Sequence, residues 1–470
     1  MLSILRHRTY RHLLIAQIVA LAGTGLATVA LSLLAYDLAG SDASAVLGTA
    51  LALKMTAYIG IAPVVGALAD RIPRRALLVS ADLIRAAAAL ALPFVTQVWQ
   101  VYALILLLQA ASAAFTPTFQ ATIPDVLPDE RDYTRALSLS RLAYDLENLF
   151  SPLLAAALLT LVSPSLLFAG TALGFLASGA LVLSVLLPRP APVERTGGLY
   201  AKAGFGTRLV LATPRLRALI ALDLAVAAGG AMVLVDTVVL VRDTLGRTAG
   251  DVSLALGAYG AGSMVVALAL PRALDRHRER TLMLPAAFAL TAVLTLLALA
   301  PVLARLTPAA PPEPLSGAGT DPSAPAWSWP ALLAAWLILG AAGSAVSTPA
   351  GRLLRRSARA ADLPAVFAAR FSLTHGCWLL TYPLAGWTAA RAGLAASAAV
   401  LAGVALVAAV AAVCLWPRAD PDALEHVHPE LAPGHPHLAG ADRCHAHDFR
   451  IDSLHPRGVT ARSWNGRSAA

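Results

Sequence analysis

Long apolar stretches alternate with short polar connections along most of the chain. Helices are expected for these stretches, because lipid cannot satisfy the hydrogen-bonding groups of irregular backbone. Each stretch is long enough to cross a bilayer as a helix. The twelve stretches lie at about 13–37, 45–69, 76–95, 99–121, 136–162, 166–187, 215–241, 250–272, 281–302, 329–349, 366–389 and 393–416. The pattern therefore predicts an all-α membrane protein with twelve transmembrane helices.

The composition agrees with a membrane protein. Of the 470 residues, 58% are hydrophobic and 13% are charged, whereas soluble domains are about half apolar and about a quarter charged. The net charge of +9 comes from basic residues that fall between the apolar stretches, which fits a membrane surface better than nucleic acid. No glycine-rich nucleotide loop, catalytic triad or metalloprotease motif is present, so we expect neither an enzyme nor a cofactor.

The basic clusters predict the orientation. They precede the first stretch and follow the second, eighth and tenth stretches, as "RHRTYRH", "DRIPRR", "DRHRER" and "RLLRRSAR". Positive residues favour the cytoplasmic side, so we expect both termini in the cytoplasm and a multi-pass protein of the bacterial cytoplasmic (inner) membrane. The first residues lack a small-x-small cleavage site behind a short apolar core, which indicates a retained start rather than a signal peptide.

The chain contains an internal repeat. Asp37 in "AYDLAG" matches Asp243 in "VRDTLG", and Asp70 matches Asp275, each about 205 residues apart. The spacing widens later because the second half carries a Pro-rich insertion. Two six-helix halves of equal topology are typical of secondary transporters. The predicted units are an N-terminal bundle (1–187), a cytoplasmic linker (188–214), a C-terminal bundle (215–416) with an extracytoplasmic Pro-rich loop at about 304–328, and a disordered cytoplasmic tail (417–470).

The loop between the second and third stretches reads "GALADRIPRR". It resembles the signature of the major facilitator superfamily, Gly-x-Leu-Ala-Asp-Arg-x-Gly-Arg-Arg, with Pro73 at a position where that family usually has Gly. The residues that fit include Gly66, Leu68, Asp70, Arg71, Arg74 and Arg75. A degenerate second copy at Asp275 and Arg276 lies where the family also keeps one. The resemblance, to the efflux-type branch, implies two bundles related by a pseudo-two-fold axis.

Two interpretations of this motif remain open. On the first interpretation the arginines are topological signals in the sense of the positive-inside rule. This does not explain Asp70, because acidic residues contribute little to orientation. The resemblance implies that Asp70 joins the two bundles when the cytoplasmic side is closed. A contact that exists in one conformation and breaks in the other biases a two-state equilibrium. The motif then acts as a gate.

Charged residues inside the apolar stretches are functional candidates, because a charge in lipid is costly. Lys54 lies 16 residues before Asp70, or ~24 Å along a helix, which is past the middle of a ~30 Å hydrocarbon core. In the fifth stretch, Asp145 and Glu147 have a similar depth. Lys54 belongs either to a structural ion pair or to substrate or proton handling.

Other candidates occupy the third, fifth and seventh stretches. They are Asp82, Arg85, Arg141, Asn148, Asp223 and Asp236. Arg141, Asp145 and Asn148 share one helix face, whereas Asp82 and Arg85 at i, i+3 also fit a purely local pair. At the deeper positions the acids outnumber the bases. Desolvation favours the neutral form of a carboxyl group, so proton-coupled antiport is a hypothesis.

Two residues depart from the pattern of drug exporters in this family. Ser151 replaces the Gly before Pro152 in the fifth stretch, and Gln109 is the polar residue nearest the position where many exporters have an Arg. Both departures weaken a direct assignment of drug efflux. From the whole pattern we expect proton-coupled export of a small solute (a drug, a siderophore or another metabolite) by alternating access, in a protein that works as a monomer in the lipid bilayer. A non-transporting membrane sensor on the same fold is the alternative from a different class.

The tail contains seven of the eleven histidines and one cysteine. Imidazole and thiolate groups suit zinc, nickel or copper. The metal-ligand candidates are His426, His428, His435, His437, Cys444, His445 and His447. The tail resembles the His-rich tails of some nickel-resistance exporters in the same superfamily. Metal export is thus an alternative function, and a plain solvated tail is the other interpretation.

Overall fold

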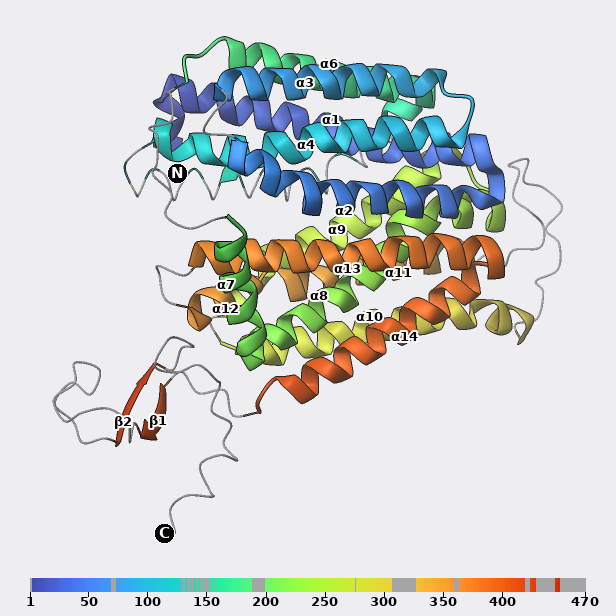
Figure 1. Ribbon diagram of the computed structural model, residues 1–470. Helices are drawn as coiled ribbons and strands as arrows, with labels where there is room; N and C mark the ends of the chain where they lie inside the picture. The colour runs from blue at the N-terminus through green and yellow to red at the C-terminus, as the bar shows by residue number, and fades with distance from the viewer. Residues whose placement is uncertain are drawn as a thin grey trace.

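The computed structural model describes residues 2–68, 73–127, 157–187, 199–274, 276–306, 327–358, 363–418, 423–427 and 444–448, and single residues between 129 and 155. The described chain is almost entirely helical (Figure 1). The first half contains α1 (Arg8–Ala39), α2 (Ala43–Leu68), α3 (Arg74–Ala91), α4 (Val98–Val126) and α6 (Pro164–Leu183).

The second half repeats this arrangement after a short helix, α7 (Leu199–Ala212). Its long helices are α8 (Pro214–Val239), α9 (Ala249–Leu274), α10 (Glu279–Leu306), α11 (Ser328–Ser347), α13 (Leu363–Ala392) and α14 (Leu394–Leu415). A π-helical turn, Leu240–Thr244, extends α8, and the short α12 (Ala350–Ser357) follows α11. Eleven of the twelve predicted stretches thus correspond to described helices. The fifth, 136–162, lies largely outside the described residues.

Helix pairing within the halves follows the internal repeat. In the first half α1 and α3 each pack against α6, and α2 packs against α4. The equivalent pairs in the second half, α8 with α14, α10 with α14 and α9 with α11, are also in contact. Small residues allow these close approaches: Thr171 on α6 donates a hydrogen bond to the Gly23 carbonyl oxygen on α1 at 2.8 Å. The fold is therefore a pair of repeat-related helical bundles.

The two halves meet mainly along α2 and α13, with further contacts of α8 to α1 and α2. Figure 1 shows the first half above the second, with α7 and α12 at the same end as the start of α1 and the end of α14. We call this end the terminal end. The other end carries the turns at Gly40 and Gly393, both with positive φ, and we call it the sealed end because the halves touch there.

The outer surface of the bundle is apolar. Leu173, Val265 and Val407 are each at least 65% exposed, a pattern that in a soluble monomer would be a large uncovered patch. Nine segments among the described residues are long and apolar enough to cross a membrane, and the first, Arg8–Gly60, covers both α1 and α2. Lipid is the solvent that this surface fits.

Two segments contain secondary structure that the sequence analysis does not specify. The predicted linker, 188–214, contains the 14-residue helix α7, which packs against α13 and α8. In the predicted disordered tail, β1 (Ala423–Val427) and β2 (Cys444–Asp448) form a two-stranded antiparallel sheet, because their backbones pair from Ala423 with Asp448 to Val427 with Cys444. The rest of the tail beyond Arg418 lies outside the described residues.

Candidate functional site

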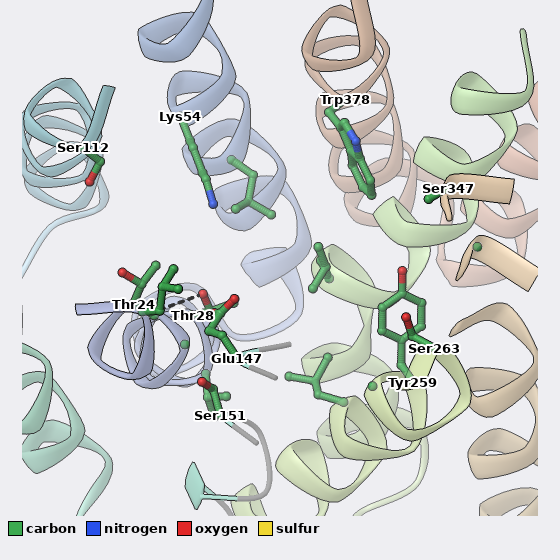
Figure 2. Close-up of a pocket in the computed structure, with 18 of the residues that line it drawn as sticks. Thr24, Thr28, Lys54, Ser112, Glu147, Ser151, Tyr259, Ser263, Ser347 and Trp378 are labelled. Atoms are coloured by element: carbon green, nitrogen blue, oxygen red, sulfur yellow. Dashed lines mark hydrogen bonds between the residues drawn. The ribbon is translucent and has the colours of Figure 1, made fainter. Parts of the chain in front are cut away.

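A cavity of about 530 Å³ lies between the two halves. Its wall comes from α1, α2, α3, α4 and the fifth segment of the first half, and from α8, α9, α11 and α13 of the second. Figure 2 shows side chains from both halves around it, among them Thr24, Thr28, Lys54, Ser112, Glu147, Ser151, Tyr259, Ser263, Ser347 and Trp378. Its volume lies in the range of small-molecule sites, about 300–1,000 Å³.

Two opposite charges line the first-half side of the cavity. Lys54 reaches in from α2 and Glu147 from the fifth segment (Figure 2). The two groups interact electrostatically across the cavity, but among the described contacts no ion pair within 4 Å joins them. The structure thus brings together the two residues whose depths agree in the sequence.

The position of Glu147 depends on a glycine in α1. A Cβ atom on Gly25 would overlap the Ser151 side chain and lie 3.1 Å from Oε1 of Glu147. Gly25 therefore lets the fifth segment approach α1 closely, which carries Glu147 to the cavity wall. Ser151 occupies this contact, at the position where family exporters have Gly.

The second-half side is aromatic and hydroxylated. Trp378 and Tyr382 on α13 are in contact, with ring centroids 5.0 Å apart and ring planes tilted by 35°. Tyr259 on α9 lies on the same wall. Gly230 on α8 makes room for the Trp378 indole, since a Cβ there would overlap the ring. This wall offers apolar faces with a few polar atoms, a combination typical of sites for amphipathic ligands.

Arg85 reaches the cavity from α3 but is held by its neighbours. Its guanidinium pairs with Asp82 one turn earlier and lies 4.2 Å from the Phe115 ring centroid and 4.5 Å from that of Phe175. Both charged residues are buried within the first half. Cation–π contacts and the ion pair fix the guanidinium, so the local pair of the sequence analysis is present and also forms part of the cavity wall.

Asp223 lies away from the cavity lining, in an ion pair within the second half. Arg370 on α13 donates two hydrogen bonds to its carboxylate, at 2.8 and 3.1 Å, and Thr374 donates a third at 3.0 Å. The bidentate geometry is the strong form of such a pair. This contact joins α8 to α13 near the terminal end. Asp236 also lies away from the cavity lining, near the sealed end.

The signature motif is described only in part. Asp70 and Arg71 lie outside the described residues, and for Gly66 and Leu68 only the helical backbone is described. Arg74 begins α3, and Arg75 donates a hydrogen bond to the Leu183 carbonyl oxygen at the end of α6. The structure therefore fixes the end of the motif against the first half and does not test the gating role.

In the second copy of the motif, Asp275 also lies outside the described residues, and Arg276 is exposed. Among the described residues here the buried acid is Glu279. Its carboxylate forms an ion pair with Arg352 at 2.9 Å and accepts a hydrogen bond from Arg356 at 3.0 Å, both on α12. Glu279 was not among the sequence candidates. It is the first residue of α10, where an acid is favoured by the helix dipole, and this was the signal available in the sequence.

Several other candidates cannot be placed. Arg141, Asp145 and Asn148 in the fifth segment, and His428, His435 and His437 in the tail, lie outside the described residues. For His426, Cys444, His445 and His447 only the strand backbone is described. Among the residues with described side chains no group of three or more potential ligands could hold a metal ion.

Together, two repeat-related bundles and a cavity between them are the architecture of two-bundle secondary transporters. The sequence agrees: the model of the Major Facilitator Superfamily matches residues 13–311 and 224–438. The chain therefore belongs to the major facilitator superfamily, a family of transporters and not of enzymes, as the signature motif predicted. The prediction of the fold class is also confirmed.

Individual relatives are more distant. Macrolide efflux protein A of Enterococcus faecalis is 29% identical over 153 residues, which are 30% of this chain and 47% of that protein. The uncharacterized MFS-type transporter YfiS of Bacillus subtilis is 28% identical over 148 residues, 30% of this chain and 35% of that protein. The chain thus matches less than half the length of these curated relatives.

Solved structures show the fold across nearly the whole chain. The nucleoside transporter NupG has a TM-score of 0.63 at 14% identity, over 87% of this chain and 98% of that one. A bacterial homolog of the human lysosomal transporter Spinster, in an inward-facing and unoccupied conformation, scores 0.64 at 13% identity, over 87% and 97%. At these identities the likeness concerns the fold alone.

Proposed function

We propose that this chain exports a small amphipathic solute from the cytoplasm by alternating access, driven by inward proton flow. The observation that carries the proposal is the cavity shared by both halves, with Lys54 and Glu147 on one wall and Tyr259 and Trp378 on the other. Transporters of this two-bundle kind bind substrate between the halves near the bilayer midplane and move the halves around it. The efflux name of the macrolide relatives supports export over import.

The arginines support an orientation with the terminal end in the cytoplasm. Described arginines at the sealed end are Arg242, Arg247, Arg305 and Arg391, whereas α3, α8, α12 and the loop before α10 carry theirs at the terminal end. Positive residues concentrate on the cytoplasmic side. With this orientation the cavity, whose wall includes Gln17 and Thr348 toward the terminal end, belongs to the inward-facing state that loads an exported solute.

Proton coupling is supported by the carboxyl group in the cavity. Glu147 and Lys54 line the same side of the cavity and attract each other electrostatically. A cationic substrate and a proton then compete for the same carboxyl group, and such competition is sufficient for antiport. A protonated Glu147 would lose its attraction for the cation, which releases substrate on the side where the proton binds.

The substrate class follows from the lining. Aromatic faces, hydroxyl groups and one carboxylate suit an amphipathic molecule with a basic amine. A macrolide is the first compound to test, because relatives carry that name. Siderophores and other metabolites remain the comparison set.

Everted membrane vesicles from cells that express the chain test the proposal. We expect energised vesicles to accumulate the macrolide, or another amphipathic amine from a panel, above vesicles without the chain, and a protonophore to abolish the uptake. Glu147→Gln should abolish uptake at an unchanged protein level, whereas Asp42→Asn, at an exposed turn, should not. Uptake that persists without a proton gradient refutes the coupling, and absence of uptake for every solute favours the sensor.

Metal export is a second candidate, because the tail strands have a specific register. His426 pairs with His445, and His447 lies two residues further along β2. Directly opposed residues in an antiparallel pair have Cα atoms only about 4.5–5.5 Å apart, a spacing that suits imidazole ligands of zinc or nickel. Isothermal titration of the full chain with nickel or zinc, compared with His426→Ala plus His445→Ala, tests this; equal binding would refute it.

A further inference from the structure

At the sealed end the backbones of the two halves touch. A Cβ atom on Gly386 of α13 would overlap the Ser44 carbonyl oxygen of α2 and lie 3.1 Å from the Ala45 Cα atom. A Cβ atom on Gly48 would likewise meet the backbone of Tyr382. Side-chain-free positions on both helices therefore allow this contact, which we call the seam. It must separate if the sealed end opens.

Asp236 of α8 is buried behind the seam. Its exposed fraction is 0%, and the hydroxyl groups near its carboxyl group come from both halves. Ser397 of α14 lies 2.8 Å from Oδ2. Ser44 of α2, also fully buried, is beside the same carboxyl group, but neither Ser44 Oγ nor Oδ1 of Asp236 has a hydrogen bond of normal geometry. An acidic side chain is thus enclosed between the halves, and only one of its two carboxyl oxygens has a hydrogen-bond partner.

The partners of Ser397 indicate the protonation state. Its hydroxyl group lies 2.8 Å from Oδ2 of Asp236 and 3.2 Å from the Ala385 carbonyl oxygen. A serine hydroxyl has one hydrogen to donate and a carbonyl oxygen can only accept. A single hydroxyl hydrogen is weakened when two acceptors share it, whereas a neutral Asp236 that donates to Ser397 leaves that hydrogen free for Ala385.

No cation is described in contact with Asp236. In the π-helical extension of α8 the nearest charges are Arg242, which lies over the Tyr36 ring, and Asp243, which accepts a hydrogen bond from Tyr36. On α2 the nearest charged residue along the helix is Lys54, ten residues or ~15 Å beyond Ser44, and it lines the cavity. On α13 the titratable groups near Ala385 are Tyr382 and Arg391. Arg391 lies about two turns from Ala385, is exposed and lies over the Trp387 ring. The described parts of α11 and α14 contribute no charged side chain at this level. A buried carboxylate without a cation is costly, so the closed seam favours the neutral, protonated form of Asp236.

We propose that Asp236 is a proton-binding site that latches the sealed end: it holds a proton while the seam is closed and releases it to water on that side when the seam opens. The O–H bond breaks on opening and re-forms on closing, with the proton exchanged on one side of the membrane only. The site therefore sets how readily the sealed end opens and does not itself drive transport. It is independent of Glu147, so either proposal can fail alone.

The latch has a defined pH dependence. The closed state holds one proton more than the open state, so higher pH on the sealed side favours opening, by up to about tenfold per pH unit. A cysteine in the seam reports opening through its reaction with a membrane-impermeant maleimide. Ala45→Cys lies in the seam, and Asp42→Cys, at the exposed turn before α2, corrects for the pH dependence of the thiol reaction itself.

The experiment uses the full chain with its native cysteines replaced by serine, labelled in membranes from the sealed side between about pH 5.5 and about pH 8.5. We expect the ratio of Ala45→Cys to Asp42→Cys labelling to rise with pH, by up to about tenfold per unit. Adding Asp236→Asn should make the ratio low and independent of pH, and Asp236→Glu should retain a pH response.

A flat ratio in the parent, or an unchanged pH response in Asp236→Asn, would overturn the proposal. If Asp236→Asn fails to accumulate, Ser397→Ala decides. Loss of the acceptor for the neutral acid should shift the labelling curve to lower pH, and an unshifted curve would overturn the latch. Neither labelling experiment depends on solute export, so a failure of the role proposed for Glu147 would not affect them.

Discussion

Gly386→Ala tests whether the seam is the contact that seals one end. The added methyl group would meet the Ser44 carbonyl group of α2, with the carbonyl carbon at 2.9 Å and the Ala45 Cα atom at 3.1 Å. Both neighbours are backbone atoms of a helix, so they cannot rotate away as a flexible side chain would. α2 and α13 must move apart for the alanine to fit.

The size of the effect follows from this clash. Overpacking of a tight contact costs about 1–3 kcal/mol, and the cost applies only to the sealed state, because the helices are apart in the open state. A differential of this size shifts the equilibrium about 5–150-fold toward opening of the sealed end. Gly376→Ala, on the same helix, is the matched control, since nothing lies within 4 Å of its added Cβ atom.

Spin labels on Asp42→Cys and Arg391→Cys measure the result, since both positions are exposed at the sealed end and belong to different halves. We expect the short-distance population to fall in Gly386→Ala and to stay unchanged in Gly376→Ala. An unchanged distance distribution in Gly386→Ala, at normal protein level, would refute the assignment of the seam.

Three further outcomes are expected. Asp223→Asn should lower the free energy of unfolding in detergent by about 1–3 kcal/mol, because Arg370 loses its charged partner. Asp251→Asn, in a more exposed ion pair, should change it by under about 1 kcal/mol. Equal shifts of the melting temperature in the two variants would contradict this. Asp70→Asn should lower the transport rate far more than the protein level. Full activity of this variant would mean that the motif serves only to orient the helices in the membrane. Truncation after Pro417 should leave membrane insertion and export of an organic solute intact, as measured in vesicles, and loss of insertion would contradict a peripheral tail.

Much of the fold was predictable because lipid imposes a simple rule. A helix in a bilayer must be apolar over about twenty residues, so hydrophobic runs located eleven of the described helices. The repeat of Asp37 and Asp243 also has a spatial meaning: Tyr36, next to the first, donates a hydrogen bond to the second across the two halves. Helical rise alone placed Lys54 and Glu147 at similar depth, and they line one cavity.

Other features depend on helix rotation, which the pattern of apolar residues does not give. The pair of Asp223 with Arg370 depends on which face α13 turns toward α8. Trp378 and Tyr259 lie within apolar stretches and were not among the sequence candidates. Asp236 was a candidate only as an intramembrane charge, because its serine partners come from helices far apart in the sequence. The strands of the tail depend on pairing across sixteen intervening residues, for which local composition gives no signal.

The central claim is that the cavity between the halves is the transport path, and Ser263→Cys tests it most directly. Ser263 lines the cavity from α9, whereas Val265, two residues away, is 65% exposed on the outer surface. In everted vesicles we expect a bulky maleimide to block transport by the Ser263→Cys variant. A saturating concentration of transported solute should protect the introduced cysteine from the maleimide, and the Val265→Cys variant should keep its activity after the same treatment. Full transport after complete modification of Ser263→Cys would contradict the account.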